Sequence, residues 1–527
     1  MSTGAPGAGA PGAGAPAEPP GLPERSPGTR RWLFADQLGP HFLDRPEQPV
    51  LLVESTDVLR RAPVHRRKAH LVLSALRHRA AELGERAVVL RAGTYGEALA
   101  QVGEPVSACD PTSWGARRLV RRLAAAGAAG ERAEVRVLAS RGFVVSEEQF
   151  GHWVRHRARG RLLMEDFYRD VRRHHGLLLD GRGGPVGGSW NHDAANREPP
   201  PRSGRLEVPD PWWPVEDDVD AQVREDLDRL QRQGVRFLGE DGPRRFAVTR
   251  AEALAALEHF LQHRLEAFGA HEDAVLSQQP WMAHSLLSVP QNLGLLDPLE
   301  VARRAEEHGR ARRLRVASVE GFVRQVVGWR SWNWHLHWHL GPGYRESNAL
   351  RAHEPLPRWF ADLDDGAVGA NCLAHVLRGV REEGWVHHVP RLMVLGGWAL
   401  QRRYRPAELA DWFRRAFVDG HEWVMTTNVV GVSQHADGGV VATKPYTSGG
   451  AYVDRMSDLC GGCRYDPAVR VGERACPYTA GYWAFLHAQR ERLAANPRLR
   501  QALRGLDRLG DLDAVLAQER ARGAAPP

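Results

Sequence analysis

The stretch DRMSDLCGGCRYDPAVRVGERACPY (residues 454–478) contains three of the five cysteines in a chain of 527 residues. Cys460 and Cys463 form a C-x2-C pair, and Cys476 is followed directly by a proline. Cys372, at the start of a predicted helix, lies 88 residues before Cys460 and completes a set of four. Five cysteines in so long a chain do not predict a disulfide framework, so the grouped ones are expected to bind a metal or a cluster.

Four cysteines are a complete ligand set for zinc or for an iron–sulfur cluster. In a zinc finger the second pair repeats the spacing of the first, which this pattern does not do. A cysteine followed by proline is familiar in cluster-binding segments, so the pattern favours a cluster, with zinc and unligated core thiols as the alternatives. Cys109 stands apart in the sequence and is expected to be an unligated thiol.

The length and composition predict a large folded chain that follows a short disordered N-terminal tail. The length allows two or three domains with a substantial core. Residues 1–29 are mostly Gly, Ala and Pro, so they cannot offset the entropy of ordering and predict a disordered tail. We find no secretory signal pattern and no run of about 18 apolar residues. The chain is therefore expected to be soluble and cytoplasmic, without a membrane partner.

The net charge and the aromatic content indicate what kind of molecule the protein binds. The formal net charge is +7, supplied mostly by arginine, which is compatible with a polyanionic partner such as nucleic acid. An arginine-rich composition without such a partner is the alternative. The 17 tryptophans are more informative, because tryptophan stacks on bases and passes electrons as well as packing in cores.

Residues 30–145 predict a parallel α/β domain, because apolar strands alternate with an amphipathic helix at residues 65–86. The domain has no Gly-rich phosphate loop of the dinucleotide or Walker type. The expected strands lie within RWLF (31–34), PVLLVEST (49–56), AVVLRAG (87–93) and AEVRVLAS (133–140).

Residues 146–245 are expected to connect this domain to a second one. The segment LLLDGRGGPVGGSWNHDAANREPPPRSG (177–204) is rich in Gly, Pro, Asn and Asp, which predicts mostly irregular structure. Loops this long inside a folded protein are usually functional. A flexible linker is the alternative, but a plain spacer has no need of Trp190, Asn191, Asp193, Asn196 and Arg197.

Residues 246–510 predict an all-helical domain, and residues 511–527 a C-terminal tail. Thr249 and Glu252 form a capping-box pattern at the first helix. Strand-like segments are nearly absent from this half. The other expected helices lie at residues 297–309, 318–338, 371–385, 405–420 and 478–496.

Several motifs over residues 31–505 resemble those of one family. An α/β half followed by a Trp-rich helical half resembles the photolyase–cryptochrome superfamily. HSLLSVPQNLGLLDP (284–298) and GFVRQVVGWR (321–330) resemble that superfamily's flavin phosphate-binding turn and flavin-domain helix. Four more specific motifs are similar to the iron–sulfur bacterial cryptochromes and photolyases, the prokaryotic (6-4) photolyases. These motifs are SWNHDAANREPP (189–200), GWVHHVPRLMV (384–394), NVVGVSQHADGG (428–439) and TKPYTSGGAYVDRMSDLCGGCRYDP (443–467).

The resemblance implies a Rossmann-like α/β antenna domain, a long connector and a helical FAD-binding domain with a four-iron four-sulfur (4Fe-4S) cluster. It implies that Cys372, Cys460, Cys463 and Cys476 bind this cluster, which is expected to be structural because four thiolates leave no open position. The antenna ligand in the family is 6,7-dimethyl-8-ribityllumazine. Asp36 and Gln37 match the family's antenna motif at a strand end, where ligands bind in open α/β sheets.

FAD is the implied catalytic cofactor. His284, Ser285, Leu287 and Ser288 precede a helix expected to begin near Pro298, a position suited to a pyrophosphate, with an ordinary helix cap as the alternative. Asn292 and Arg324 are implied neighbours of the flavin. Arg391 and Asp437 match an Arg–Asp ion pair beside the isoalloxazine ring.

The implied catalytic residues are two histidines, two tyrosines and one tryptophan. His387 and His388 match the family's lesion-facing histidines, which move a proton during repair. Tyr446 and Tyr452 are expected to stack on an extruded base, with core tyrosines as the alternative.

Trp412 matches the tryptophan nearest the flavin in the chain of aromatic residues that reduces it. The next position of this relay falls on Ala361. Trp359 or Phe360 is the expected substitute, with Phe413 as a further candidate.

The implied function is light-driven repair of UV-damaged DNA by a monomeric, nucleoid-associated lyase. Photoexcited reduced FAD transfers an electron to a flipped-out pyrimidine–pyrimidone (6-4) photoproduct. A cryptochrome-like blue-light photoreceptor with the same cofactors is the first alternative, and a cyclobutane-dimer photolyase differs in the lesion alone. A DNA-binding cluster protein akin to primase large subunits is the third alternative, which predicts no bound flavin.

Overall fold

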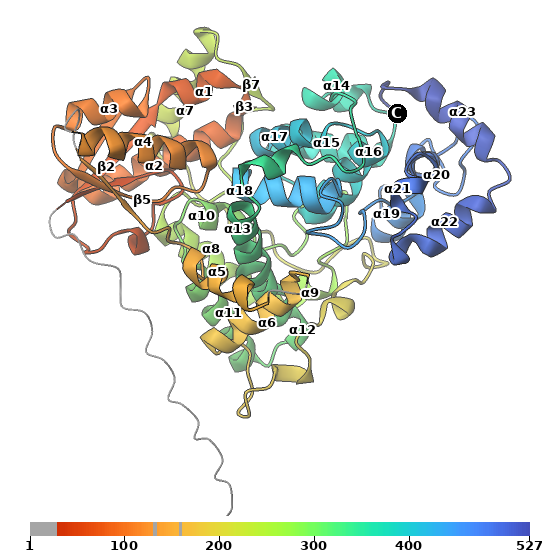
Figure 1. Cartoon of the computed structure of the whole chain (residues 1–527), viewed down its shortest axis with the longest axis horizontal. Helices are drawn as coiled ribbons and strands as arrows, with labels where there is room; N and C mark the ends of the chain where they lie inside the picture. Colours follow the sequence, from red (N-terminus) through yellow and green to blue (C-terminus); the bar gives the residue numbers. More distant parts are fainter. Residues whose placement is uncertain (1–28, 130–133, 158–160) are drawn as a thin grey trace, which may run out of the picture.

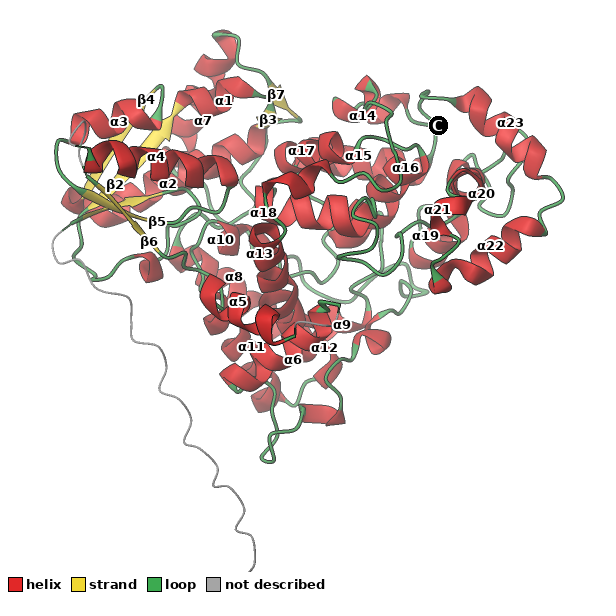
Figure 2. Cartoon of the chain, viewed as in Figure 1, coloured by secondary structure: helices red, strands yellow, loops and turns green. Residues whose placement is uncertain are grey.

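A computed structural model describes residues 29–129, 134–157 and 161–527, and the expected disordered tail lies almost wholly outside them. A five-stranded parallel sheet in the order β4-β2-β1-β5-β6 forms the α/β part (Figures 1 and 2). Its strands are β1 (Arg30–Leu33), β2 (Val50–Ser55), β4 (Ala87–Ala92), β5 (Val106–Cys109) and β6 (Val135–Leu138). The four expected strands are confirmed. The sequence prediction missed β5, whose four residues include Ser, Ala and Cys and carry little strand signal.

Both faces of the sheet are buried, as parallel sheets require. Trp32 and Leu51 point to one face, which packs on α3 (Tyr95–Val102) and α4 (Trp114–Ala128). Leu33 and Leu52 point to the other face, which packs on α2 (Arg66–Leu83) and belongs to the same apolar cluster as the core of the helical part. The two halves therefore share one continuous core.

The expected connector is more structured than its composition indicates. It contains α5 (Glu147–His156), α6 (Met164–His175) and α7 (Asp218–Arg232). Helix α7 packs on α2, and α6 packs on a helical segment of the second half. The stretch between α6 and α7 is irregular, as expected, apart from short 3-10 turns at Val186–Gly188 and Asp193–Asn196. This part of the chain therefore joins the halves through packed helices.

The second half is helical. Helix α8 (Arg250–His263) begins with the expected capping box of Thr249 and Glu252. A two-stranded parallel ladder of β3 (Val64–His65) and β7 (Phe237–Leu238) lies before it in the chain. The remaining α-helices are α1 (Thr56–Arg61), α9 (Leu265–Ala270), α10 (Ser288–Asn292), α11 (Pro298–Arg312), α12 (Val316–Val323), α13 (Arg330–His339), α14 (Arg358–Ala361), α15 (Asn371–Glu383), α16 (Gly397–Gln401), α17 (Pro406–Ala416), α18 (Glu422–Met425), α19 (Gly450–Met456), α20 (Pro477–Ala488), α21 (Arg490–Leu493), α22 (Arg500–Asp507) and α23 (Leu512–Arg522).

Three helical segments of this half have π-helical hydrogen bonding: η5 (Arg324–Trp329), η8 (Pro390–Gly396) and η9 (Thr426–Ser433). Such segments are rare and often mark functional sites, because the wider turn displaces side chains from the regular helical face. Each lies in or beside one of the sequence motifs quoted above.

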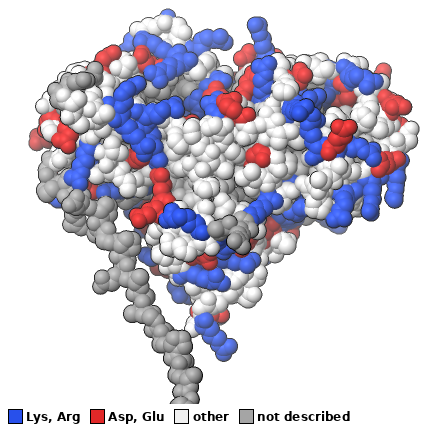
Figure 3. All heavy atoms as spheres, in the orientation of Figure 1, with Lys and Arg blue, Asp and Glu red and all other residues white. Residues whose placement is uncertain are grey.

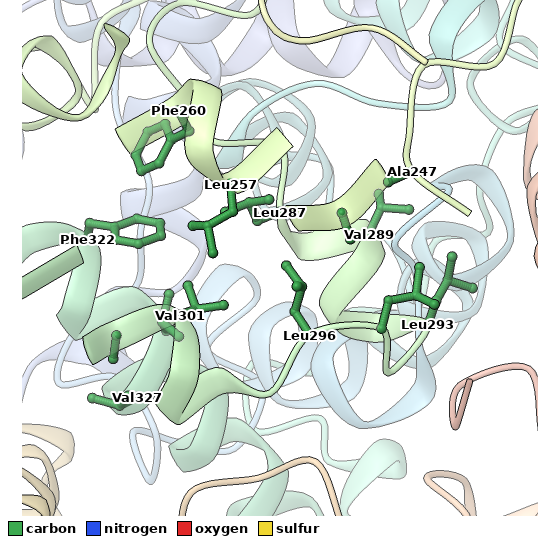
Figure 4. Close-up of a cluster of buried hydrophobic side chains, with 14 of the residues drawn as sticks. Ala247, Leu257, Phe260, Leu287, Val289, Leu293, Leu296, Val301, Phe322 and Val327 are labelled. Carbon is green, nitrogen blue, oxygen red and sulfur yellow. The ribbon is translucent and has the colours of Figure 1, made fainter. Parts of the chain in front are cut away.

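Apolar side chains from α8, α10, α11, α12 and η5 fill the core between these helices (Figure 4). The rings of Phe260 and Phe322 lie 4.7 Å apart and are almost fully buried. Burial of each contributes about 1.5–3 kcal/mol. This core fixes the loop that carries His284, because Leu287 and Val289 belong to it.

The expected C-terminal tail is a packed helix, so this prediction is wrong. Helix α23 packs on α20, with Val515 fully buried (Figure 1). The Pro527 carbonyl accepts a 3.0 Å hydrogen bond from the Ala370 N–H, directly before α15. Within the described residues, no helix is both long enough and apolar enough to cross a membrane.

Candidate functional site

Three histidines from two separate segments lie together in the helical half. His284 precedes α10, and His387 and His388 precede η8. The rings of His284 and His387 are stacked at 4.4 Å, and the ring of His388 lies 5.6 Å from His284 and 5.7 Å from His387. His387 is 3% exposed, whereas the His388 side chain is half exposed. The cluster thus reaches from the core to the surface.

The three imidazoles differ in their surroundings. Burial lowers the pKa of His284 and of His387 well below the usual range, and the neighbouring histidines lower it further. His388 Nε2 lies 3.1 Å from an Asp273 carboxylate oxygen, and this contact raises the pKa of His388 against the opposing effect of burial. Burial also raises the pKa of Glu272, the residue directly before Asp273, to about 7. The site therefore holds two neutral imidazoles beside a third that is held by a carboxylate.

The two predicted tyrosines lie on the exposed side of this cluster. Tyr452 is in α19, and burial together with nearby Asp273 raises its pKa to about 12. Tyr446, in the loop before α19, is 36% exposed. The segment that carries Asp273 runs beside the end of α19, because the Val275 N–H donates to the Met456 carbonyl at 2.9 Å. Sequence segments far apart thus bring histidine and tyrosine side chains to one place.

Arg324 fixes the connector to the site. It is 3% exposed and lies 3.2 Å from Asp193 of the connector and 3.3 Å from Glu320. Asn196 is fully buried and donates to the Ala317 carbonyl at 2.9 Å. Arg197 lies close enough to influence both Asp273 and Tyr452 electrostatically. Asp193 and Arg197 of the connector therefore lie beside the candidate site, whereas Asn196 anchors the connector to α12.

The predicted Arg391–Asp437 ion pair is wrong. Arg391 pairs with Asp419 through two hydrogen bonds of 2.8 and 3.2 Å. Against the effect of burial, Arg391 and Ser288 hold the pKa of Asp419 below its usual range. Asp437 instead accepts a 2.8 Å hydrogen bond from the Tyr344 hydroxyl and caps the N–H groups of its own loop.

The predicted phosphate-binding turn is joined to this ion pair. Ser288 donates to an Asp419 carboxylate oxygen at 2.9 Å, and the Asn292 side chain donates to the Asp419 carbonyl at 3.0 Å. The Ser285 hydroxyl accepts from the Leu287 N–H, and Leu287 itself is buried in the core. The structure thus brings His284, Ser288, Asn292 and Arg391 together, and it assigns Leu287 to packing.

The four grouped cysteines come from three elements that meet at one point. Cys372 is in the first turn of α15, Cys460 and Cys463 share a tight turn after α19, and Cys476 caps α20. The Asn371 side chain donates to the Leu459 carbonyl at 2.8 Å, which joins the first two elements. Burial and the three neighbouring thiols raise the pKa of Cys372 well above its usual value. Thiols placed this way disfavour each other's ionisation unless a metal is present to offset it.

The cysteines are joined to the tyrosines by a close backbone approach. A Cβ atom added at Gly450 would lie 2.7 Å from Cys476 Sγ, so any larger residue would displace the sulfur. Gly450 begins α19, two residues before Tyr452. A change at the cysteines is therefore transmitted directly to the helix that carries this tyrosine.

The chain resembles proteins of known name. A (6-4) photolyase of Agrobacterium fabrum (strain C58) is 37% identical over 490 residues, which cover 89% of this chain and 93% of that protein. The chain belongs to the (6-4) photolyase family. Residues 31–240 also match the family described as deoxyribodipyrimidine photo-lyase-related protein. A crystal structure of a bacterial class III photolyase from Agrobacterium tumefaciens has a TM-score of 0.55 at 16% identity, covers 96% of this chain and 98% of its own, and shows the fold alone.

The aromatic side chains predicted to form an electron relay lie close to one another. Trp412 is 1% exposed, and its indole N–H donates to the Ala361 carbonyl at 3.0 Å. Its ring lies 4.8 Å from Phe360, whose neighbour Trp359 lies 5.7 Å further on and is partly exposed. Trp359 also lies 6.2 Å from Trp398. A series of neighbouring rings thus runs from Trp412 through Phe360 to the partly exposed Trp359, without using the position of Ala361.

Asp36 and Gln37 lie just beyond the carboxyl end of β1. Asp36 accepts a hydrogen bond from the Thr112 hydroxyl, and the Gln37 amide donates to the Cys109 carbonyl at 3.2 Å. Leu38, next in the motif, donates its N–H to the Leu293 carbonyl of the helical half at 3.0 Å. The motif therefore joins the two halves. Asp36 and Gln37, the predicted antenna residues, form hydrogen bonds with other residues of the protein.

Sequence reasoning missed several residues of this candidate site. Asp273, Glu272 and Asp419 lie outside any recognisable motif, and only the fold brings them to the histidines and to Arg391. For Asp419 the one available signal was its position directly after the Trp412 helix. The π-helical segments gave no signal either, because their residues have ordinary helical spacing.

Proposed function

We propose that this protein repairs (6-4) photoproducts in UV-damaged DNA with light. The observation that carries the proposal is the cluster of the buried His284 and His387 with the half-exposed His388, which opens beside Tyr446 and Tyr452. In the part of the chain that the structure describes, both ring nitrogens of His387 and Nε2 of His284 lack hydrogen-bond partners. Buried polar atoms rarely stay unpaired, so such atoms support a site that a polar ligand completes.

The lesion pocket follows from these residues. The rings of Tyr446 and Tyr452 offer faces on which an extruded base stacks, and extrusion is least costly where base pairing is already damaged. His388 then holds the lesion from the exposed side and His387 from the buried side. Asp273 fixes the His388 ring through Nε2, which leaves Nδ1 to exchange a proton with the lesion's hydroxyl.

FAD is the cofactor that the family implies, and the residues present fit it. Unpartnered polar atoms among the described residues include Gln291 Nε2 and Arg330 Nε, beside the predicted phosphate-binding turn. Arg391, Ser288 and Asn292 would hold the cofactor through the polar frame built on Asp419. When bound in its reduced form, FAD supplies the photoexcited electron that repair requires.

A 4Fe-4S cluster held by Cys372, Cys460, Cys463 and Cys476 is the second proposed group. The grouping of the four thiols supports a metal centre at this point, because the neighbouring thiols help to raise the pKa of Cys372 and that of Cys460. We propose a structural role, because the centre joins α15, α19 and α20. For the lumazine antenna the support is weaker, since Asp36 and Gln37 are already bonded within the protein.

Trp359→Phe is expected to slow photoreduction of the flavin severalfold while leaving repair by chemically reduced protein unchanged. Phenylalanine keeps the packing but is a poor hole carrier, so a hole that crosses the Phe360 ring from Trp412 no longer finds a tryptophan to receive it, and the separated charges recombine. The measurement is flavin absorbance under blue light with an external reductant. Trp483→Phe on α20 is the matched control, and an equal loss in both variants would contradict the relay.

The DNA surface is proposed to include α21, α22 and the turn between them. Six exposed arginines lie there, and they are Arg490, Arg492, Arg498, Arg500, Arg504 and Arg508. Figure 3 places basic side chains along the edge where Figure 1 has these helices. Arg498 donates to the Thr443 hydroxyl at 2.6 Å, which joins this surface to the loop of Tyr446. Phosphate contacts by arginine dominate affinity for DNA.

Reversing the charge of Arg500 and Arg504 to Glu is expected to weaken binding of damaged and undamaged duplexes alike. The salt dependence should fall as well, by about 0.9 in the slope of log K against log salt for each phosphate that is no longer neutralised. Fluorescence anisotropy over a salt series measures both quantities. The control reverses Arg232 and Arg236 near the end of α7, which are equally exposed. An unchanged slope in the test variant would remove these helices from the DNA surface.

A further inference from the structure

The three site histidines are arranged as the ligands of a metal ion. His284, His387 and His388 each offer a ring nitrogen, and these three nitrogens all lie within 4.8 Å of one another. Neutral imidazole is a preferred ligand of borderline first-row divalent cations, which bind it at about 2.0–2.1 Å. Because the rings of His284 and His387 are stacked, side-chain rotations that turn their nitrogen lone pairs towards one point would bring the three nitrogens onto one ion.

The hydrogen bonding of the cluster favours the same conclusion. His387, which is 3% exposed, has no partner for either nitrogen among the described residues, and His284 Nε2 is also unpartnered. His388 is held through Nε2 by Asp273 at 3.1 Å, so its Nδ1 is the nitrogen that faces outward from that contact. A carboxylate on the far nitrogen of a ligand histidine is the usual outer support of a metal site.

The charges around the cluster do not exclude a cation. Arg391 is neutralised by Asp419 at 2.8 Å, and Arg324 lies beside Asp193 and Glu320. Arg264 donates to backbone carbonyls, which include those of Pro209, Met282 and His284. The carboxylates nearest the histidines are those of Glu272 and Asp273, and the buried Glu272 Oε2 lacks a hydrogen-bond partner in the described structure.

A second group of potential ligands forms ion pairs within the protein. His78, Asp217 and Asp220 also lie within 4.8 Å of one another. Asp217 caps helix α7 and contacts His78 at 3.2 Å, and Asp220 pairs with Arg244 at 3.1 Å. Each residue of this group has a side-chain partner, whereas neither ring nitrogen of His387 has a partner among the described residues.

We propose that His284, His387 and His388 form a binding site for a borderline divalent cation such as Zn²⁺, and that the ion and the lesion exclude each other. The exclusion rests on the proposed function, because it assumes that the lesion uses the same ring nitrogens. Three histidines leave one position of a tetrahedral ion open to water. An ion bound at this site would prevent the lesion from binding and so stop repair. A chelator that removes the ion would restore repair.

The binding experiment uses the purified holoprotein, with its flavin and iron content measured first. Zn²⁺ is titrated calorimetrically, with Mg²⁺ as the comparison ion, because Mg²⁺ prefers oxygen ligands. We expect one Zn²⁺ site that His387→Ala abolishes. Asp273→Asn should weaken it about 10- to 100-fold, as loss of an outer partner does. His388→Ala tests the same site at a half-exposed position, where loss of the fold is not expected.

The matched control is His152→Ala, which removes one ring of an exposed pair at His152 and His156. It should leave the strongest Zn²⁺ site unchanged. The proposal is overturned if wild type has no Zn²⁺ site, or if folded His387→Ala and His388→Ala protein binds Zn²⁺ as wild type does.

The exclusion is tested with photorepair of a lesion-containing oligonucleotide in Zn²⁺ and then in excess chelator. We expect one equivalent of Zn²⁺ to stop repair and the chelator to restore it. Full repair with the site occupied overturns the exclusion. If Zn²⁺ binds at the histidines but no repair occurs in either condition, the metal site stands and the proposed function fails.

Discussion

His388→Ala is expected to lower the rate of (6-4) photoproduct repair by about 10²–10⁴-fold, the usual contribution of a positioned acid or base. The side chain lies at the exposed end of the histidine cluster and is held by Asp273 at 3.1 Å. No other described side chain offers a carboxylate-held imidazole beside Tyr452. Because the residue is half exposed, its removal should leave the fold and the flavin content intact.

Single-turnover repair by chemically reduced protein measures this effect without the photoreduction step. Flavin absorbance near 450 nm, recorded before reduction, gives the cofactor content of each variant. His152→Ala on α5 is the control for loss of an imidazole elsewhere. Loss of flavin together with repair in His388→Ala would make the residue structural and would contradict its place in the lesion pocket.

Cys460→Ala is expected to unfold the helical half and not merely to slow an electron-transfer step. The four cysteines join α15, α19 and α20, and metal binding of this kind contributes directly to folding energy. Losing it removes an amount comparable to the whole stability of a domain, about 5–15 kcal/mol. Iron, flavin and the cooperative thermal transition of the helical half should therefore be lost together.

Iron content, flavin absorbance and circular dichroism on heating measure the three losses. The control is Cys109→Ala, a buried thiol in β5 with Arg31 as its neighbour at 3.4 Å. It should keep iron and flavin at wild-type content. A Cys460→Ala protein that lacks the cluster but retains flavin and a wild-type thermal transition would contradict the structural role.

The order of the elements could be predicted from the sequence because most strands and helices carry strong local signals. Runs such as LLVES and the capping box of Thr249 and Glu252 fold as their local pattern indicates. Strand β5 and helix α23 do not carry such signals. The first is short and built of small residues, and the second is stabilised by packing on α20, which no local pattern reveals.

The site could be predicted only as far as it lies in motifs. His387, His388 and three of the cysteines stand in distinctive segments, whereas Cys372 was predicted only as the cysteine that completes the set of four; the structure gathers each set in space. The partner of Arg391 could not be predicted from the sequence, because no local pattern distinguishes Asp419 from Asp437. The choice depends on tertiary packing, in which α17, shortly before Asp419, packs against η9, shortly before Asp437. Asp273 was missed for the same reason, since its role arises from the ladder-like contact of Val275 with the end of α19.

The most direct test of the account is light-driven repair itself. Purified holoprotein with fully reduced flavin is mixed with an oligonucleotide that carries one (6-4) photoproduct, and the products are resolved chromatographically after blue light and after an equal time in the dark. The account predicts that the lesion disappears in the light alone and that two intact pyrimidines replace it. A lesion that survives illumination while the flavin stays reduced would contradict the photolyase function and favour a photoreceptor.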